Sequence, residues 1–222
     1  ALVAEQIGEG QIVKRIKKGI EEAYGAGGSG ELIAEKIQLD TFVLKRLEFL
    51  RSEFDHRQVN IITRLSATAS ISIPPDPLRK VFDGLLKNAI ENTPDEGKLE
   101  VVVKRQGEGT LLEMRDFGVG ITKENKTRIF EGFFATQETM DYSSKRPFDF
   151  NAGGKGADLL RMKIFSERYD FKIGLESYRC PFIPKDSDTC PGTISKCPHC
   201  KDGSGCHQSV ATIFSIYFPP DR

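Results

Sequence analysis

Three short segments of the sequence carry groups that could bind a divalent cation and a phosphorylated ligand. Asn88 offers an amide oxygen on a helical pattern, and Mg²⁺ accepts such hard oxygen ligands while it keeps several waters. Asp116 opens a DFGVG loop, and an ionised carboxylate only accepts hydrogen bonds, which suits an amine. The GGKG run at 153–156 precedes another helical pattern, where free backbone N–H groups bind phosphate and a lysine adds positive charge.

Each segment also has an ordinary structural explanation. A helix asparagine can form a local hydrogen bond, an Asp-x-Gly-x-Gly sequence is a common turn, and glycines ahead of a helix can form a plain loop. Thr212, on the last strand pattern, can simply be an exposed strand residue. One segment alone therefore does not specify a nucleotide site.

The five cysteines all lie between positions 180 and 206, with two histidines among or beside them. Cys197 and Cys200 have the CxxC spacing of zinc ligands, and Cys190 and Cys206 flank this pair within loop reach. We predict a structural Zn²⁺ held by these four cysteines, with Cys180, expected on a strand, left over. Since we expect the nucleotide site elsewhere, removal of the metal should spare much of the nucleotide affinity.

Disulfides, a redox switch and unliganded thiols remain alternatives for the cysteine segment. The start of the chain lacks the basic and apolar pattern of a signal peptide, so we expect a cytoplasmic location. A reducing cytoplasm favours metal binding over disulfides.

The elements that must position these residues follow from hydrophobic periodicity. Helical spacing runs through 5–24, through a second helix that we expect Asp40 to cap, and through 78–92 and 159–169. Period-two patterns predict strands at 59–65, 69–73, 99–104, 110–115, 171–177 and 210–218. This order predicts an α+β fold, a two-layer α/β sandwich whose mixed sheet has helices on one face.

The Gly/Ser run at 25–30 predicts a break between two parts of the chain. We predict an N-terminal helical segment and linker at 1–38, which could be the tail of a dimerisation hairpin. The remainder, 39–222, is predicted to be one catalytic domain with a Cys-rich insertion at 178–209 in its C-terminal hairpin.

Composition narrows the possible functions. The chain has 222 residues, of which 38% are hydrophobic and 29% charged, so it can bury a sizeable core. Lys and Arg together number 32, as do Asp and Glu, which gives no case for non-specific binding of nucleic acid or of an anionic membrane. No apolar run approaches the roughly 18 residues of a membrane span.

The order of four segments adds a resemblance to these local arguments. LLKNAIENTP at 85–94, DFGVGI at 116–121, IFEGFF at 129–134 and GGKGADLL at 153–160 follow one another along the chain. They resemble the asparagine, first glycine, phenylalanine and second glycine boxes of the ATP-binding catalytic domain of sensor histidine kinases. That domain belongs to the superfamily shared with gyrase, MutL and the large heat-shock chaperone, and the resemblance covers roughly residues 39–219.

The resemblance implies a site for Mg-ATP. Asn88 would bind Mg²⁺, Asp116 would accept a hydrogen bond from the adenine amino group, and the glycines of the DFGVG loop would admit base and ribose. Residues 135–152 would be the ATP lid. The nucleotide-binding residues implied are Lys87, Asn88, Asn92, Asp116, Gly118, Gly120, Ile121, Phe130, Gly154, Lys155, Gly156 and Thr212.

Three positions depart from the family pattern. Gly84 stands where the family often has Asn or Glu, Glu91 where many members have Lys, and Asp158 where the second glycine box has glycine. A carboxylate near a triphosphate weakens binding unless a cation pairs with it, and Lys87, Lys155 or lid cations could do so. These departures put the catalytic rate in doubt.

By resemblance, the chain is the catalytic part of a sensor histidine kinase, with no catalytic residue of its own beyond the ATP site. The γ-phosphate would pass to a histidine on a dimerisation domain of the same protein and then to a response regulator. His56 is expected to be a surface residue at a helix end. The alternatives are a degenerate, nucleotide-gated interaction module and a stand-alone ATPase, which would need a carboxylate at the position of Gly84.

Overall fold

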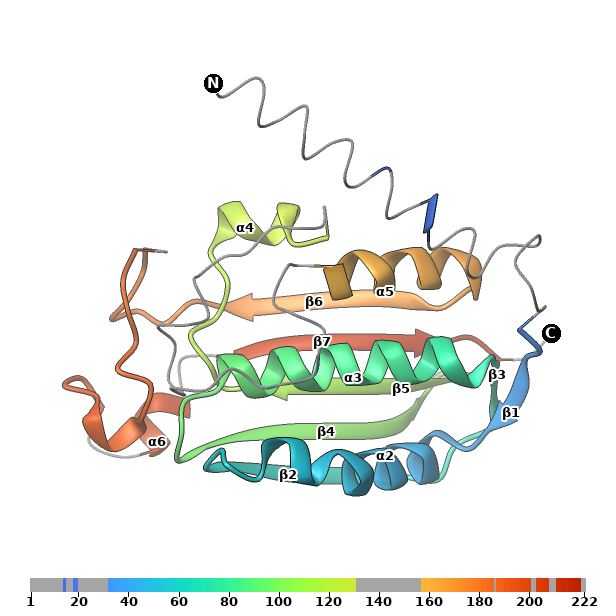
Figure 1. Ribbon diagram of the computed structural model, residues 1–222, viewed down its shortest axis with the longest axis horizontal. Helices are drawn as coiled ribbons and strands as arrows, with labels where there is room; N and C mark the ends of the chain where they lie inside the picture. Colours follow the sequence, from blue (N-terminus) through green and yellow to red (C-terminus); the bar gives the residue numbers. More distant parts are fainter. Residues whose placement is uncertain are drawn as a thin grey trace.

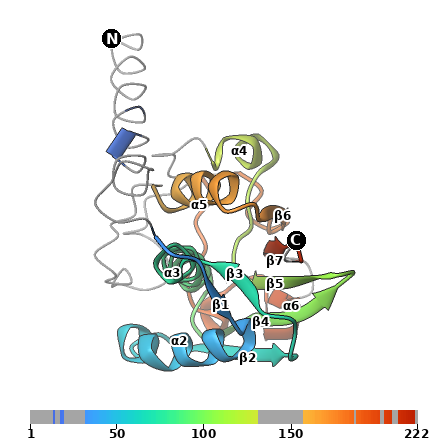
Figure 2. The ribbon, with the colours of Figure 1, turned by 90° about the vertical axis from the view of Figure 1, so that its right-hand side faces the viewer.

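Two layers make up the fold (Figures 1 and 2). The computed structural model describes residues 32–130, 157–185, 187–200, 203–207 and 211–220, together with Lys14, Lys18 and Gly19, which are helical. The rest of the predicted N-terminal helix lies outside the described residues. The strands are β1 (Glu35–Ile37), β2 (Val59–Leu65), β3 (Ile71–Ile73), β4 (Gly97–Gln106), β5 (Gly109–Asp116), β6 (Lys172–Tyr178) and β7 (Ala211–Phe218). The helices are α2 (Leu39–Phe54), α3 (Pro75–Asn92), α4 (Lys123–Arg128), α5 (Ala157–Arg168) and α6 (Gly203–His207), with a 3₁₀ turn η2 (Ile194–Lys196).

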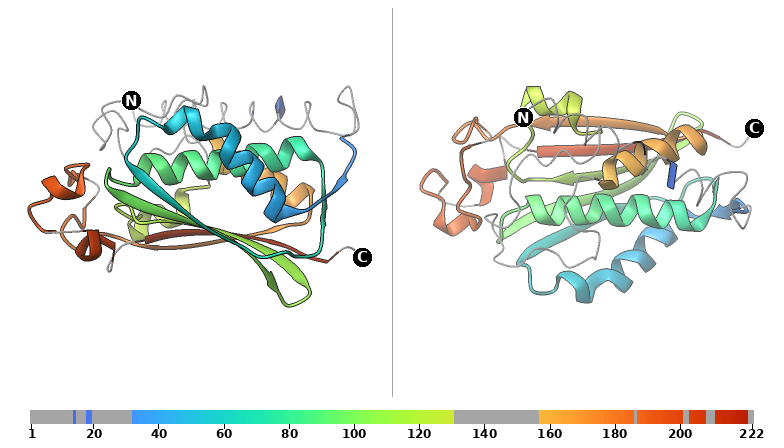
Figure 3. Two further views of the ribbon diagram at one scale, coloured as in Figure 1. Left: turned by 90° about the horizontal axis from the view of Figure 1, so that it is seen from below. Right: turned by 45° about the horizontal axis from the view of Figure 1, so that its top comes forward.

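The main sheet has the strand order β2-β4-β5-β7-β6. β2 runs parallel to β4, and the other neighbouring pairs are antiparallel, so the sheet is mixed. Helices α2, α3 and α5 lie on one face of it (Figure 3). The predicted α+β sandwich is therefore confirmed. Since β6 and β7 are antiparallel neighbours, the Cys-rich segment is an insertion in the C-terminal hairpin, as the sequence indicated.

Two details of the start of the domain differ from the sequence prediction. β1, which lies in the segment expected to be linker, pairs with β3, so residues 71–73 do not join the main sheet. Asp40 does not cap α2: the helix begins at Leu39 after Gln38, which makes no side-chain capping bond. The apolar side chains of Leu39 and Val43 are completely buried, so packing rather than a cap sets this end.

Helix α3 crosses the sheet and supplies much of the core. It begins at Pro75, ahead of the apolar stripe that starts at Leu78, and a proline at the first helical position has no N–H to leave unsatisfied. Its buried face packs against the sheet and α5 through side chains that are almost wholly buried: Leu78, Val81, Phe82, Leu85, Leu86 and Ile90. None of the described helices is long and apolar enough to cross a bilayer.

A buried arginine holds the C-terminal end of α3. Arg57, which follows α2 and is 6% exposed, donates to the carbonyl oxygens of Ile90 at 2.9 Å and Thr93 at 2.8 Å. Its Nε also bonds the Asp95 carboxylate at 2.9 Å. The last carbonyls of a helix lack partners within the helix, so the guanidinium satisfies them and ties α2 to the loop after α3.

Arg57→Met should destabilise the chain by about 3 kcal/mol, because it removes a charged donor from two buried carbonyls and from the Asp95 carboxylate. Urea unfolding followed by circular dichroism measures the loss. Arg51→Met is the control, since Arg51 is exposed on the last turn of α2 and should cost less than about 1 kcal/mol. Equal losses in the two variants would contradict the assigned role of Arg57.

Candidate nucleotide-binding site

Asp116 ends β5 with its carboxylate buried. The residue is 4% exposed, and its Oδ1 accepts a hydrogen bond from the Gly118 N–H at 3.1 Å. The Thr212 N–H, directly opposite on β7, also bonds the carboxylate. Burial raises the pKa of Asp116 to about 7, although these backbone donors oppose the rise. The site therefore presents a carboxyl group that changes charge near neutral pH.

Thr212 is buried rather than exposed, so the ordinary explanation offered for it is wrong. Its hydroxyl lies 2.9 Å from the hydroxyl of Ser177 on β6. The Ser177 oxygen in turn accepts the Ile121 N–H at 2.9 Å. A polar chain thus links β6, β7 and the loop after β5. Sequence reasoning missed Ser177, since nothing in its local sequence distinguishes it from any other strand serine.

The two glycines of the loop are required by the protein's own backbone. A Cβ on Gly118 would overlap the carbonyl oxygen of Asn92 at the end of α3. A Cβ on Gly120, which has φ +72°, would overlap the carbonyl of Tyr178 at the end of β6. The absence of a side chain therefore first serves close packing of the loop between α3 and β6. From the sequence, these glycines are expected only to give the nucleotide access to the backbone.

The contact between Gly118 and Asn92 brings the loop to the last turns of α3, which carry Asn88. The Asn92 side-chain amide donates to the Asn88 carbonyl oxygen at 2.7 Å. Asn88 itself is half-buried, and its own amide makes no hydrogen bond with any described residue. The chemistry of this amide oxygen fits Mg²⁺.

The charged departures from the family pattern meet between α3 and α5. Lys87, which is 3% exposed, pairs with Glu91 at 3.8 Å within α3. Burial raises the pKa of Glu91 to about 7, Lys87 opposes the rise, and Asp158 adds to it. Asp158 pairs with Arg161 of its own helix at 3.2 Å. Among the described residues, the cation that pairs with Asp158 is therefore Arg161 and not Lys87, which was expected from the sequence.

Asp158 also fills the space above Gly84. An ideal Cβ built on Gly84 would lie 3.2 Å from the Asp158 Cβ. A carboxylate from α5 is thus placed beside the position where α3 itself has no side chain.

The remaining implied nucleotide-binding residues divide into two groups. Phe130 is half-buried and packs edge-on against Phe214 of β7 with ring centroids 6.5 Å apart, which fits a structural role. Gly154, Lys155, Gly156 and the lid segment at 135–152 lie outside the described residues.

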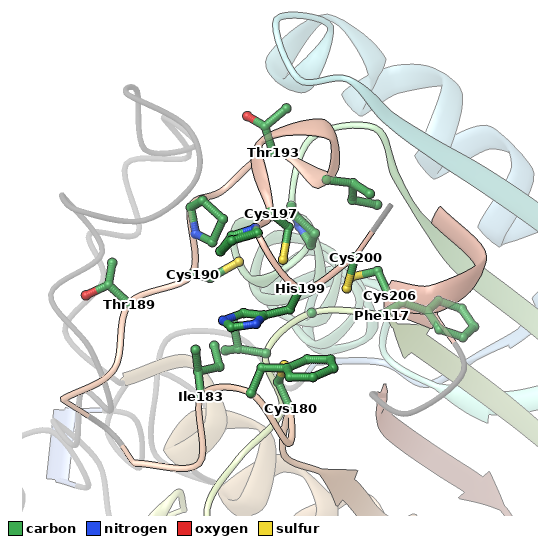
Figure 4. A pocket seen from close by; sticks show the side chains of 17 residues that line it. Phe117, Cys180, Ile183, Thr189, Cys190, Thr193, Cys197, His199, Cys200 and Cys206 are labelled. Carbon is green, nitrogen blue, oxygen red and sulfur yellow. The ribbon is translucent and has the colours of Figure 1, made fainter. Parts of the chain in front are cut away.

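The five cysteines line one cavity of about 80 Å³ (Figure 4). Cys180 belongs to this group: β6 ends at Tyr178, so the prediction that Cys180 lies on a strand is wrong. All five are free thiols. Burial raises the pKa of Cys190 and Cys200, and that of Cys206 to about 12, so the neutral thiol is favoured at these positions. Within the described part of the chain, no three His, Cys, Asp or Glu side chains are positioned to hold a metal ion.

The same cavity is lined by Phe117, Gly118 and Val119 of the DFGVG loop. We expect the nucleotide site elsewhere from the sequence, whereas the structure places the insertion against the loop that carries Asp116. The reason is topological, since β5 and β6 both flank β7 and the insertion leaves β6 next to the end of β5.

Solved structures of histidine kinases have a similar fold. The mycobacterial sensor histidine kinase MprB aligns with a TM-score of 0.58 at 15% identity, covering 85% of this chain and 100% of that one. Full-length ShkA in complex with AMPPNP aligns with a TM-score of 0.61 at 14% identity, covering 96% of this chain and 36% of that one. At these identities the likeness shows the fold alone.

Relatives found by sequence comparison are also kinases. Sporulation kinase E of Bacillus subtilis is 27% identical over 128 residues, which is 57% of this chain and 17% of that protein. The circadian input-output histidine kinase CikA of Synechococcus elongatus is 24% identical over 153 residues, 68% of this chain and 19% of that protein. The chain thus matches less than a fifth of the length of either relative.

Residues 74–219 match the profile of a family described as histidine kinase-, DNA gyrase B- and HSP90-like ATPases. This range runs from the start of α3 to the end of β7 and contains Asn88, Asp116 and Thr212. The chain therefore belongs to the family of histidine kinase-, DNA gyrase B- and HSP90-like ATPases.

Proposed function

We propose that the chain binds Mg-ATP and is the catalytic part of a protein-histidine kinase. The observation that carries this proposal is the packing of Gly118 on the Asn92 carbonyl, because it brings the loop of the buried Asp116 against the last residue of α3, one helical turn after Asn88. Asp116 would accept a hydrogen bond from the adenine amino group, and Asn88 would bind the Mg²⁺ that contacts the phosphates. The bound cation would neutralise phosphate charge, and the protein would contribute mainly positioning.

The phosphate acceptor in this proposal is a histidine outside the chain, on a dimerisation domain of the same longer protein. A response regulator would then receive the phosphoryl group. His56, exposed just after α2, follows the end of a helix. These partners come from the resemblance to sensor kinases, of whose length the chain matches only a fraction.

A stand-alone ATPase is the second candidate, and one observation favours it. Water attack on the γ-phosphate would need a carboxylate near the turn before Asn88. Asp158 of α5 lies against Gly84 and supplies a carboxylate there, although Arg161 pairs with it. The degenerate module is the third candidate, supported by Glu91, a carboxyl group near Asn88 where many members of the family have a lysine.

Asp116→Asn should weaken Mg-ATP binding by about 1.5–3 kcal/mol, because a charged acceptor for the adenine amine is lost. In the native chain, affinity should fall about tenfold from about pH 8 to about pH 6. Binding uses the ionised carboxylate, and with a pKa of about 7 its fraction drops from roughly ten elevenths to one eleventh. Isothermal titration calorimetry across this pH range makes both measurements.

The Asp116→Asn variant is also the control for the pH profile. Ionisation of the ATP phosphates and of Glu91 is common to both proteins, so the ratio of their affinities isolates Asp116. A ratio that does not change with pH, or an unaltered affinity in the variant, would remove Asp116 from the adenine site.

The isolated chain should not phosphorylate itself when given radiolabelled ATP, because its acceptor lies elsewhere. Addition of the histidine-bearing segment of the longer protein should produce acid-labile label on that segment. A label on the isolated chain that is lost in the His56→Gln variant would contradict the proposal. Release of phosphate without any protein label would favour the ATPase, provided that this release is lost in the Asp158→Asn variant.

We further propose a structural Zn²⁺ in the insertion, held by Cys190, Cys197, Cys200 and Cys206. The support is the gathering of soft thiol ligands around one cavity, since Zn²⁺ binds four such ligands tetrahedrally. Zinc binding can supply on the order of 10 kcal/mol to order a small module.

Protein purified without added zinc should contain close to one zinc per chain by plasma emission analysis. Cys197→Ser should abolish the metal and Cys180→Ser should retain it. If Cys180→Ser loses the zinc instead, Cys180 is a ligand and one of the four named cysteines is not. A content near zero, with all thiols titrating freely, would refute the site, and an iron content with visible absorbance would assign a different metal.

A further inference from the structure

The insertion is attached directly to the loop that contains Asp116. The Cys180 N–H donates to the Val119 carbonyl at 2.9 Å. Arg179 donates through Nη1 to the Gly120 carbonyl at 3.0 Å. Both contacts are made to the backbone of the loop, so they constrain its path rather than one side chain.

The guanidinium of Arg179 joins the loop to the first turn of the insertion. Its Nε donates to the Ile183 carbonyl at 2.8 Å and its Nη2 to the Lys185 carbonyl at 2.6 Å. A guanidinium is a rigid planar fork, so the three carbonyls that it bonds cannot move independently. The conformation of 179–185 is thereby coupled to the position of Gly120.

A second attachment reaches the loop that follows α3. The Asp95 N–H donates to the Gly192 carbonyl at 3.0 Å, and the Ile194 N–H donates to the Asp95 carbonyl at 3.2 Å. The Ser195 N–H and hydroxyl bond the Glu96 carboxylate at 2.7 and 2.8 Å. The insertion therefore bridges the two segments that bracket the candidate site.

Between these attachments lies the cysteine cavity. Figure 4 shows the side chains of Cys190, Cys197, Cys200 and Cys206 around it, with Phe117 of the loop beside Cys206. Among the described residues of the insertion, the only buried hydrophobic side chains are Ile183, Ile194 and Cys200. So small an apolar core offsets little of the entropy lost on ordering the segment. A cross-link through the cysteines would make the insertion a rigid support.

We infer that metal bound by these cysteines holds the loop at 116–121 in its nucleotide-binding conformation, so that zinc occupancy raises the affinity for ATP. This inference rests on the proposed ATP and zinc sites. A loop already ordered by the metal loses less conformational entropy when the nucleotide binds. The coupling is reciprocal, so ATP must raise zinc affinity by the same factor, and we expect about five- to hundredfold.

The test measures this reciprocity on the folded, zinc-loaded chain. Calorimetry first gives the affinity for Mg-ATP. Competition with a chromophoric zinc chelator then gives the zinc affinity with and without saturating Mg-ATP. Asp116→Asn controls for zinc chelated by free nucleotide, because it sees the same nucleotide but binds it weakly. We expect ATP to tighten zinc binding in the native chain and not in the variant.

Arg179→Met should lower the coupling factor while the zinc content stays near one per chain, because it cuts the link to Gly120 but removes no thiol. Arg105→Met is its matched control. Arg105 is exposed and bonds Gly107 and Glu108 of its own hairpin, so its loss should leave the coupling unchanged.

If the zinc-loaded chain binds both ATP and zinc and neither changes the affinity for the other, the inference is overturned. If it fails to bind ATP at all, the proposed function is wrong and the coupling falls with it, and calorimetry identifies that case before the competition experiment begins.

Discussion

The close packing of one loop between two backbone carbonyls is the constraint on which the candidate site depends. Gly118 lies against the carbonyl of Asn92 at the end of α3, and Gly120 lies against the carbonyl of Tyr178 at the end of β6. Neither contact tolerates a Cβ, so the loop approaches both elements more closely than any other residue would allow. This packing holds the loop that follows Asp116 against the last residue of α3, one helical turn after Asn88.

Hydrogen bonds from outside the loop hold the end of α3 and the loop itself. Arg57 bonds the last carbonyls of α3 and the Asp95 carboxylate, while Ser177 bonds the loop at Ile121 from β6. The two supports come from opposite edges of the sheet, since Arg57 precedes β2 and Ser177 lies on β6. The site is thus assembled across the whole width of the sheet.

The strand order also explains why a cysteine-rich insertion lies beside a nucleotide site. β7 is paired with β5 on one side and β6 on the other, so a segment inserted between β6 and β7 emerges next to the end of β5. Arg179 and Cys180, at the start of the insertion, bond the loop that follows Asp116. The insertion then bonds Asp95 and Glu96 before the chain enters β7. An insertion in another hairpin of this sheet would have left the Asp116 loop untouched.

The sequence by itself determined the fold class, most helices and strands, and the order of the four family segments. Period-two and helical spacing report which face of an element is buried, and they are local properties. Strand β1 escaped this reasoning, because three residues carry too little pattern and its partner β3 lies far along the chain. The assignment of Asp40 as a cap failed because buried Leu39 and Val43 set the start of α2.

Only the tertiary structure decided how the site is supported. Arg57, Ser177 and Arg179 bond backbone groups of residues far away in the sequence. Such bonds cannot be predicted from the local spacing of residue types. The pairing of Asp158 with Arg161, the burial of Thr212 and the meeting of Cys180 with the other cysteines likewise follow from how strands and helices are placed. Residue types specify which chemistry is available, whereas burial and neighbours, which depend on the whole fold, specify which groups meet and in which charge state.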